Sequence, residues 1–267
     1  MKARHALLLV ASLAACAQPA AESSEPDLAV PDAVEIDDYP ADADALYAEF
    51  APLPRGPMAV DYDVEGPGGM KGTMTVIVAE GARRAESWAL DMPMPDGETM
   101  QIAGSSIQTA AMSWTDAAEG SAETVSLPLG RIGKAFFELD RDTQHAVINH
   151  VRTWHREVAR GREAHPGAVD SVAGQPCLRT RTAGQTLCVW ETTGLPLEYR
   201  SEAFAVVATS VRVGVTVEDD TFAIPAGAPL KTDALQTFDV DASLRTLASG
   251  NLAELPGLLQ PRLRVPG

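Results

Sequence analysis

Short runs in which apolar and polar residues alternate fill much of the chain, and turn residues separate them. The clearest run is "MAVDYDVE" at 58–65, where four apolar side chains share one parity and three acidic side chains take the other. Such alternation predicts a strand with one buried face. Further strands are predicted at 72–79, 83–91, 98–103, 106–114 and 122–127. Because no helical pattern separates these runs, the series predicts an antiparallel meander.

The period of the pattern changes between 132 and 161. Ile148, Val151, His155 and Val158 recur at helical spacing there, and a shorter helical stretch precedes them. Strands are predicted again at 168–173, 176–181, 186–191 and 195–201, followed by a long one at 203–217. The tail, 233–267, has weak helical patterning interrupted by three prolines. This order predicts an α+β domain.

The first sixteen residues, "MKARHALLLVASLAAC", have the form of a secretory signal peptide. A basic start, with Lys2 and Arg4, precedes an apolar run that is too short to span a bilayer. Residues 13–16, "LAAC", resemble a bacterial lipobox, which implies that Cys16 becomes the lipidated first residue, carrying acyl chains such as palmitate. The alternative is an ordinary signal peptide with a chance cysteine near its end. No Asp follows Cys16, and the resemblance then implies the outer membrane rather than the inner one.

The composition after the signal divides the chain further. Residues 17–45 are rich in Ala, Pro, Asp and Glu, and such a segment buries too little apolar surface to fold. We therefore expect a signal peptide at 1–15, a lipidated Cys16 and acidic tether at 16–45, a folded domain at 46–232 and a tail at 233–267. The formal charge is −16, and loss of Lys2 and Arg4 gives −16 − 2 = −18. This charge argues against nucleic-acid binding and leaves membrane attachment to the acyl chains.

Assignment of Cys16 to lipid leaves two cysteines, Cys177 and Cys188. If strands 176–181 and 184–190 meet across a turn at Thr182 and Ala183, the two cysteines lie directly opposite each other, where a disulfide can form. An exported protein occupies a compartment in which disulfides persist. The sequence therefore favours a disulfide clamp. A metal site, a redox pair and unpaired thiols remain as alternatives.

Several motifs resemble the LolA-like lipoprotein-carrier superfamily. They are "VDSVAGQPC", "CVWETTGLPLEYRSE", "AFAVVATSVRVGVTVEDD" and "TFAIPAGA", with an opening hairpin in "DYDVEGPGGMKGTMTVIV". The likeness covers roughly 58–228, and the lipobox brings the chain closer to the membrane-anchored, LolB-like members. It implies a strongly curved, open antiparallel β-sheet, or half-barrel, with helices covering the concave face. It also implies that acyl chains or other lipids are held in the apolar space between them.

The methionines suggest where such a ligand would lie, since all except Met1 fall between 58 and 112. Flexible, polarizable methionines suit a wall that accepts varied apolar partners. Ordinary core filling and a Cu(I) site are the alternatives. Together with nearby aromatic residues, the candidates for the ligand cavity are Trp88, Met92, Met94, Met100, Met112, Trp114, Phe136 and Trp190.

No motif for catalysis or a cofactor occurs in the chain. The sequence lacks G-x-S-x-G, H-E-x-x-H and G-x-x-x-x-G-K, so we expect neither an enzyme nor a bound cofactor or metal. His145, His150 and His155 are five residues apart and point in different directions on a helix. We expect a periplasmic domain, anchored to the outer membrane, that binds or carries a lipid or other hydrophobic ligand, with a protein partner also conceivable. The alternative is a non-catalytic envelope scaffold that binds a protein.

Overall fold

The computed structural model describes residues 39–52, 55–117, 123–164, 169–182, 184–190, 193–227, 230–231 and 239–251. Residues 40–267 form one compact unit, and the description concerns that unit. The predicted signal peptide, Cys16 and nearly all of the predicted tether lie outside the described residues, as does the end of the tail. Helix α2 (Ala43–Phe50) begins before Leu46, where the folded domain was expected to start.

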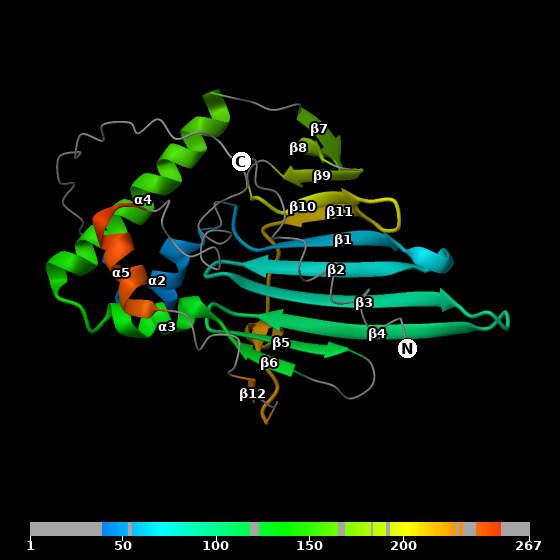
Figure 1. Cartoon of the computed structure of the whole chain (residues 1–267), viewed down its shortest axis with the longest axis horizontal. Coiled ribbons are helices and arrows are strands. Elements are labelled where there is room, and N and C mark those ends of the chain that lie inside the picture. The colour runs from blue at the N-terminus through cyan, green and yellow to red at the C-terminus, as the bar shows by residue number, and fades with distance from the viewer. Residues whose placement is uncertain are drawn as a thin grey trace. The chain divides into compact units, whose positions relative to one another are not determined.

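The described strands form one open sheet with the order β12-β6-β5-β4-β3-β2-β1-β11-β10-β9-β8-β7 (Figure 1). Every pairing is antiparallel except that of β12 with β6. Two meanders, β1–β6 and β7–β11, join where β1 pairs with β11. The predicted open antiparallel sheet is thus confirmed. Its strands are β1 (Met58–Glu65), β2 (Lys71–Ala79), β3 (Arg83–Pro93), β4 (Thr99–Gln108), β5 (Met112–Ala117), β6 (Glu123–Ser126), β7 (Val169–Val172), β8 (Gln175–Thr182), β9 (Gln185–Trp190), β10 (Pro196–Arg200), β11 (Ala205–Val213) and β12 (Leu230–Lys231).

Helices between and after the meanders complete the unit. They are α3 (Pro128–Phe136), α4 (Arg141–Ala164) and α5 (Val240–Ser249), with short 3₁₀ helices η3 (Pro67–Gly69) and η4 (Asp219–Phe222). Carboxylate caps start three of the described α-helices, since Asp42 accepts from the Ala45 N–H, Asp140 from the Thr143 N–H and Asp239 from the Ala242 N–H. Each cap satisfies an amide that has no partner within its helix. Within the described part of the tail, residues 239–251, the predicted helical patterning corresponds to α5.

Small residues let α2 and α3 approach the turns at one end of the strands. A Cβ on Gly81, in the β2–β3 turn, would lie 3.4 Å from the Cβ of Tyr47 in α2. A Cβ on Gly133 of α3 would lie 2.5 Å from the Tyr47 ring, and one on Gly130 would lie 2.5 Å from the Ala111 Cα. Figure 1 shows both helices beside this end of the sheet.

Two strand predictions are wrong. Residues 98–103 and 106–114 were expected as separate strands, but β4 runs unbroken through Gly104 and β5 begins only at Met112. The glycine does not interrupt the strand, because the Trp88 ring and the Asp116 carbonyl fill the space of its missing Cβ. The strand expected at 203–217 ends at Val213, and its register shifts opposite Asp61 and Tyr62. Because of this bulge, odd-numbered residues face the core on one side of it and even-numbered residues on the other.

Candidate functional site

The sheet has one face that is apolar and buried along β1 and β2. Val60 of β1 and Val76 of β2 are opposite each other on this face, and both are fully buried. Of the alternate residues of β1, Asp63 and Glu65 are exposed, Asp61 is half-buried and Ala59 is buried. The face that carries Val60 and Val76 is called the inner face below, and the other is the outer face.

The inner face continues onto β3 and β4, where its apolar side chains become more exposed towards the β3–β4 turn. Leu90 lies opposite Ile102, and Met92 lies opposite Met100. Leu90 is 7% exposed, whereas Met100, nearer the β3–β4 turn, is 40% exposed. Figure 1 shows this turn at the end of the strands away from the helices. The inward side chains of this hairpin are called the hairpin face, which consists of Trp88, Leu90, Met92, Ile102 and Met100.

Trp88 forms the start of the hairpin face. It lies opposite Gly104 on β4, and a Cβ on Gly104 would come within 2.4 Å of the Trp88 ring. The Trp88 ring therefore lies over the glycine and occupies the space that a side chain at residue 104 would take. The indole Nε1 is buried and has no hydrogen-bond partner within the structure as described.

The register divides the predicted cavity residues between the two faces. Trp88, Met92 and Met100 share the inner face, but Trp114 lies opposite Ile107, three residues from Gly104, and so faces outward. Met112 has the parity of Trp114 and faces outward too. The sequence could not show this, because parity is defined only within each strand and pairing relates one strand to the next.

The remaining three candidates lie apart from the hairpin face. Met94 follows β3 in the turn and is 37% exposed. Phe136 is fully buried in α3, with its ring edge-on to Phe137. Trp190 is fully buried on β9, opposite Cys177. The eight side chains therefore do not line one cavity as the sequence suggested.

Two open grooves occur elsewhere on the unit. One, of about 500 Å³, lies between the start of α4 and α5, lined by Leu139, Thr143, Asp241, Leu244, Arg245, Ala248 and Ser249. The other, of about 190 Å³, lies on the outer face of β2–β4 beside η4, and is lined mainly by small hydroxyl and apolar side chains. None of the eight predicted cavity residues lines either groove.

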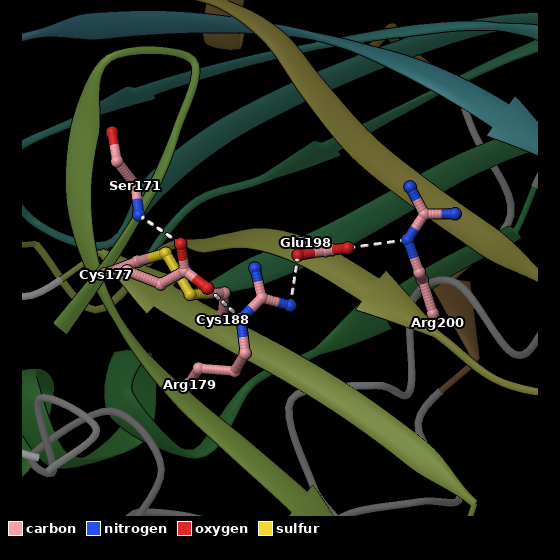
Figure 2. Close-up of a disulfide and its surroundings, with 7 residues drawn as sticks. Ser171, Cys177, Arg179, Cys188, Glu198 and Arg200 are labelled. Carbon is pink, nitrogen blue, oxygen red and sulfur yellow. Dashed lines mark hydrogen bonds and ion pairs between the residues drawn. A yellow bond between two sulfur atoms is a disulfide. The ribbon is translucent and has the colours of Figure 1, made fainter. Parts of the chain in front are cut away.

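The predicted disulfide between Cys177 and Cys188 is present, with a Cα–Cα distance of 5.4 Å (Figure 2). The predicted register is wrong by two residues. Arg179, not Cys177, lies opposite Cys188, so the cysteines are diagonal neighbours on one face. The register moves because Thr182 pairs with Gln185 and Gly184 supplies the positive φ, +80°, that a tight hairpin turn needs. Sheet twist shortens one diagonal enough for the bond.

Beside the disulfide, a row of charges crosses the sheet (Figure 2). Arg179 of β8 contacts Asp170 of β7 at 2.5 Å and, reaching past β9, contacts Glu198 of β10 at 2.6 Å. Arg200 also contacts Glu198, at 2.6 Å, and the Glu198 side chain is only 8% exposed. A hydrogen bond from the Ser171 N–H, followed by the Arg179 guanidinium, lowers the pKa of Asp170. This row stabilises the edge of the sheet, and sequence reasoning missed it because Glu198 meets Arg179 only through pairing.

A second link ties α2 to α4. Arg152 of α4 forms an ion pair with Glu49, and the His155 Nε2 lies 3.2 Å from the Glu49 carbonyl oxygen. Burial lowers the pKa of His155. In keeping with the sequence analysis, His150 lies elsewhere, with its Nδ1 3.1 Å from the Leu247 carbonyl of α5.

Neither a metal cluster nor a membrane-spanning helix occurs among the described residues. No three His, Cys, Asp or Glu side chains of that part of the chain come together as metal ligands. Within the same residues, no helix has both the length and the apolar character needed to cross a bilayer.

Comparisons with known proteins yield no family. No family model matches the chain, and no curated protein matches it. Among solved structures, "Structure of PNGF-II in P21 space group" matches with a TM-score of 0.31 and 8% identity over 66% of this chain and 31% of that chain. "Crystal structure of MucB" matches with a TM-score of 0.27 and 14% identity over 68% of this chain and 63% of that chain. The chain thus spans less than two thirds of either, and likenesses this low assign it to neither.

Proposed function

We propose that the domain binds a hydrophobic ligand of the acyl-chain class on the hairpin face. One observation carries the proposal: the apolar inner face, fully buried at Val60 and Val76, extends along β3 and β4 until Met100 is 40% exposed. Exposed apolar surface that continues a core is favoured where a ligand or membrane covers it. Methionines suit acyl chains of varied conformation, because their side chains are flexible and polarizable.

We propose binding rather than catalysis. We also propose the arrangement that the LolA-like resemblance implies, in which the helices cover the concave face of a strongly curved sheet. The proposal also includes a bacterial envelope lipoprotein, anchored to the outer membrane through Cys16, that holds or carries lipid. The contacts of α2 and α3 with the strand ends are compatible with helices that close one end of such a space.

A quenching experiment tests the binding. Trp88 is the tryptophan on the hairpin face, so a fatty acid brominated along its chain should quench its fluorescence on binding. Met100→Glu should weaken binding by about tenfold or more, since it places a charge against the acyl chain. The matched control is Met112→Glu, which changes the same residue type at 36% exposure on the outer face. An equal loss of affinity in both variants would exclude the hairpin face as the binding site. So would an absence of quenching in a chain with Trp88 as its sole tryptophan.

A protein scaffold remains the second candidate function, and one observation favours it. Strand β7 lies at the end of the sheet order, and Val169 in it is 56% exposed. An edge strand can pair with an extended peptide. Val169→Pro should abolish such pairing while leaving acyl binding unchanged, which separates the two functions in pull-down and quenching assays.

A further inference from the structure

The structure separates the methionines of residues 58–112 by burial. Core filling accounts for three of them, which are at most 6% exposed: Met58, Met70 and Met74. Another three gather at the β3–β4 turn, at the end of the strands away from the helices (Figure 1). Met92 lies opposite Met100, which is 40% exposed, and Met94 follows β3 and is 37% exposed. Core packing therefore does not explain why this second group is methionine.

Hydrogen bonds of the turn fix the position of Met94. Its N–H donates to the Glu98 carbonyl at 2.8 Å, and its carbonyl accepts from the Gly97 N–H at 3.0 Å. Gly97 has the positive φ, +86°, that such a turn needs. The Asp96 carboxylate accepts from the Glu98 N–H at 3.0 Å. The hairpin pairing thus continues as far as Met94, and strand alternation places this residue on the same side as Met92.

The spacing of the three methionines suits a single metal ion. Directly opposite residues such as Met92 and Met100 have Cβ atoms about 5 Å apart, and Met94 lies about 6.6 Å from Met92 along the strand. The point equidistant from the three Cβ atoms is then about 4 Å from each of them. A thioether sulfur is two bonds from its Cβ, so a metal–sulfur bond of about 2.3 Å reaches this point.

The chemistry of these ligands favours Cu(I). Thioether sulfur is a soft ligand and selects Cu(I), whereas carboxylate and carbonyl oxygens suit Mg²⁺, Ca²⁺ and Mn²⁺. The surrounding charge favours a cation, because Asp96 and Glu98 are exposed in the turn and residues 92–104 contain no Lys or Arg.

We infer that Met92, Met94 and Met100 form a Cu(I) site with three thioether ligands at the end of the β3–β4 hairpin. A Cu(I) site is one of the alternatives that the sequence left open for the methionines. It needs no cluster of His, Cys, Asp or Glu, and the described residues contain none. The inference goes beyond the proposed function and does not depend on it. Met94 lies outside the hairpin face, so its substitution separates copper binding from acyl binding.

Competition with a chelator tests the inference. The full chain is titrated with Cu(I) without oxygen, in ascorbate, against bicinchoninate, whose Cu(I) complex is coloured. Titration of thiols beforehand verifies that no free cysteine is present, because a thiolate would itself bind Cu(I). We expect one Cu(I) per chain and, in X-ray absorption, sulfur neighbours at about 2.3 Å.

Variants that keep the apolar volume identify the ligands. Met94→Leu should weaken Cu(I) binding by about tenfold or more, while quenching by the brominated fatty acid stays unchanged. The triple variant Met92→Leu/Met94→Leu/Met100→Leu should lose the site. The matched control is Met112→Leu, which changes a methionine of 36% exposure on the outer face and should keep the original affinity.

Two results would overturn the copper site and leave acyl binding standing. One is an equal Cu(I) affinity in the original chain and the triple variant, and the other is X-ray absorption with oxygen and nitrogen neighbours alone. Cu(I) binding as expected, without any quenching by the fatty acid, would support the copper site and overturn the proposed function alone.

Discussion

Removal of the disulfide provides the sharpest test of the structure. Cys177 and Cys188 are separated by 11 residues and are fully buried. For a loop of this length, the chain-entropy relation gives about 9 cal/mol/K, or about 3 kcal/mol at 25 °C. A typical domain has only about 5–15 kcal/mol of stability in total. Reduction should therefore remove a large share of it.

Urea unfolding followed by far-UV circular dichroism measures this loss. Oxidised protein, reduced protein and the Cys177→Ala/Cys188→Ala variant are compared at 25 °C. The reduced protein isolates the loss of the cross-link, because its sulfur atoms remain. The double variant should lose about 1 kcal/mol more, since buried volume is also removed. Both should show a larger dependence on urea, because the freed loop exposes more surface on unfolding.

The control for the reductant is the double variant, whose midpoint should not change when dithiothreitol is added. A loss below about 1 kcal/mol in the reduced protein would refute the reasoning, because it would mean that the loop is equally restricted without its cross-link. The full burial of both cysteines adds a kinetic expectation. Dithiothreitol should reduce the bond in native buffer only as fast as the β8–β9 hairpin opens.

Three further predictions concern other contacts. Gly104→Ala should cost about 1–3 kcal/mol of stability and shift the Trp88 emission, because the new Cβ meets the indole ring; an unchanged melting temperature would contradict this packing. The lowered pKa of His155 means that the unfolded chain binds more protons than the folded chain between the folded pKa and about 6.5. The free energy of unfolding should therefore decrease as the pH is lowered through that window. His155→Phe should flatten this part of the pH–stability curve, and an equal slope would contradict the prediction. The lowered pKa of Asp170 gives stability that is present above about pH 4 and lost as the pH falls through the folded pKa. Asp170→Asn should reduce this loss in urea unfolding between pH 2 and 5, and Asp140, whose pKa is also lowered, should retain its own contribution; an unchanged acid limb would contradict the role of Asp170.

The strands were predictable wherever local pattern and turn residues agreed. The run at 58–65 corresponds to β1 with the same bounds, and the change of period after residue 132 marks α3 and α4. The cysteines, too, were paired correctly. These features depend on residues close together in the chain, whose alternation or helical spacing needs no partner to be recognised.

The errors occurred where one strand constrains another. Gly104 was expected to divide two strands, yet Trp88 on β3 and the Asp116 carbonyl on β5 occupy its Cβ space and the strand continues. The bulge of β11 opposite Asp61 and Tyr62 reverses its parity. Val207 therefore lies opposite Asp63, whereas Val211, four residues later, lies opposite Val60 on the other face. These contacts join residues on different strands, so the pattern within one strand cannot predict them.

The sequence by itself determined that this protein has an α+β fold with an antiparallel sheet, which of its residues alternate, and which cysteines pair. Only the tertiary structure decided that Trp88 and Met100 share a face from which Trp114 and Met112 are excluded. The physical reason is pairing register. A strand's own pattern separates its two sides, but hydrogen bonds to its neighbours decide which sides of different strands form one surface.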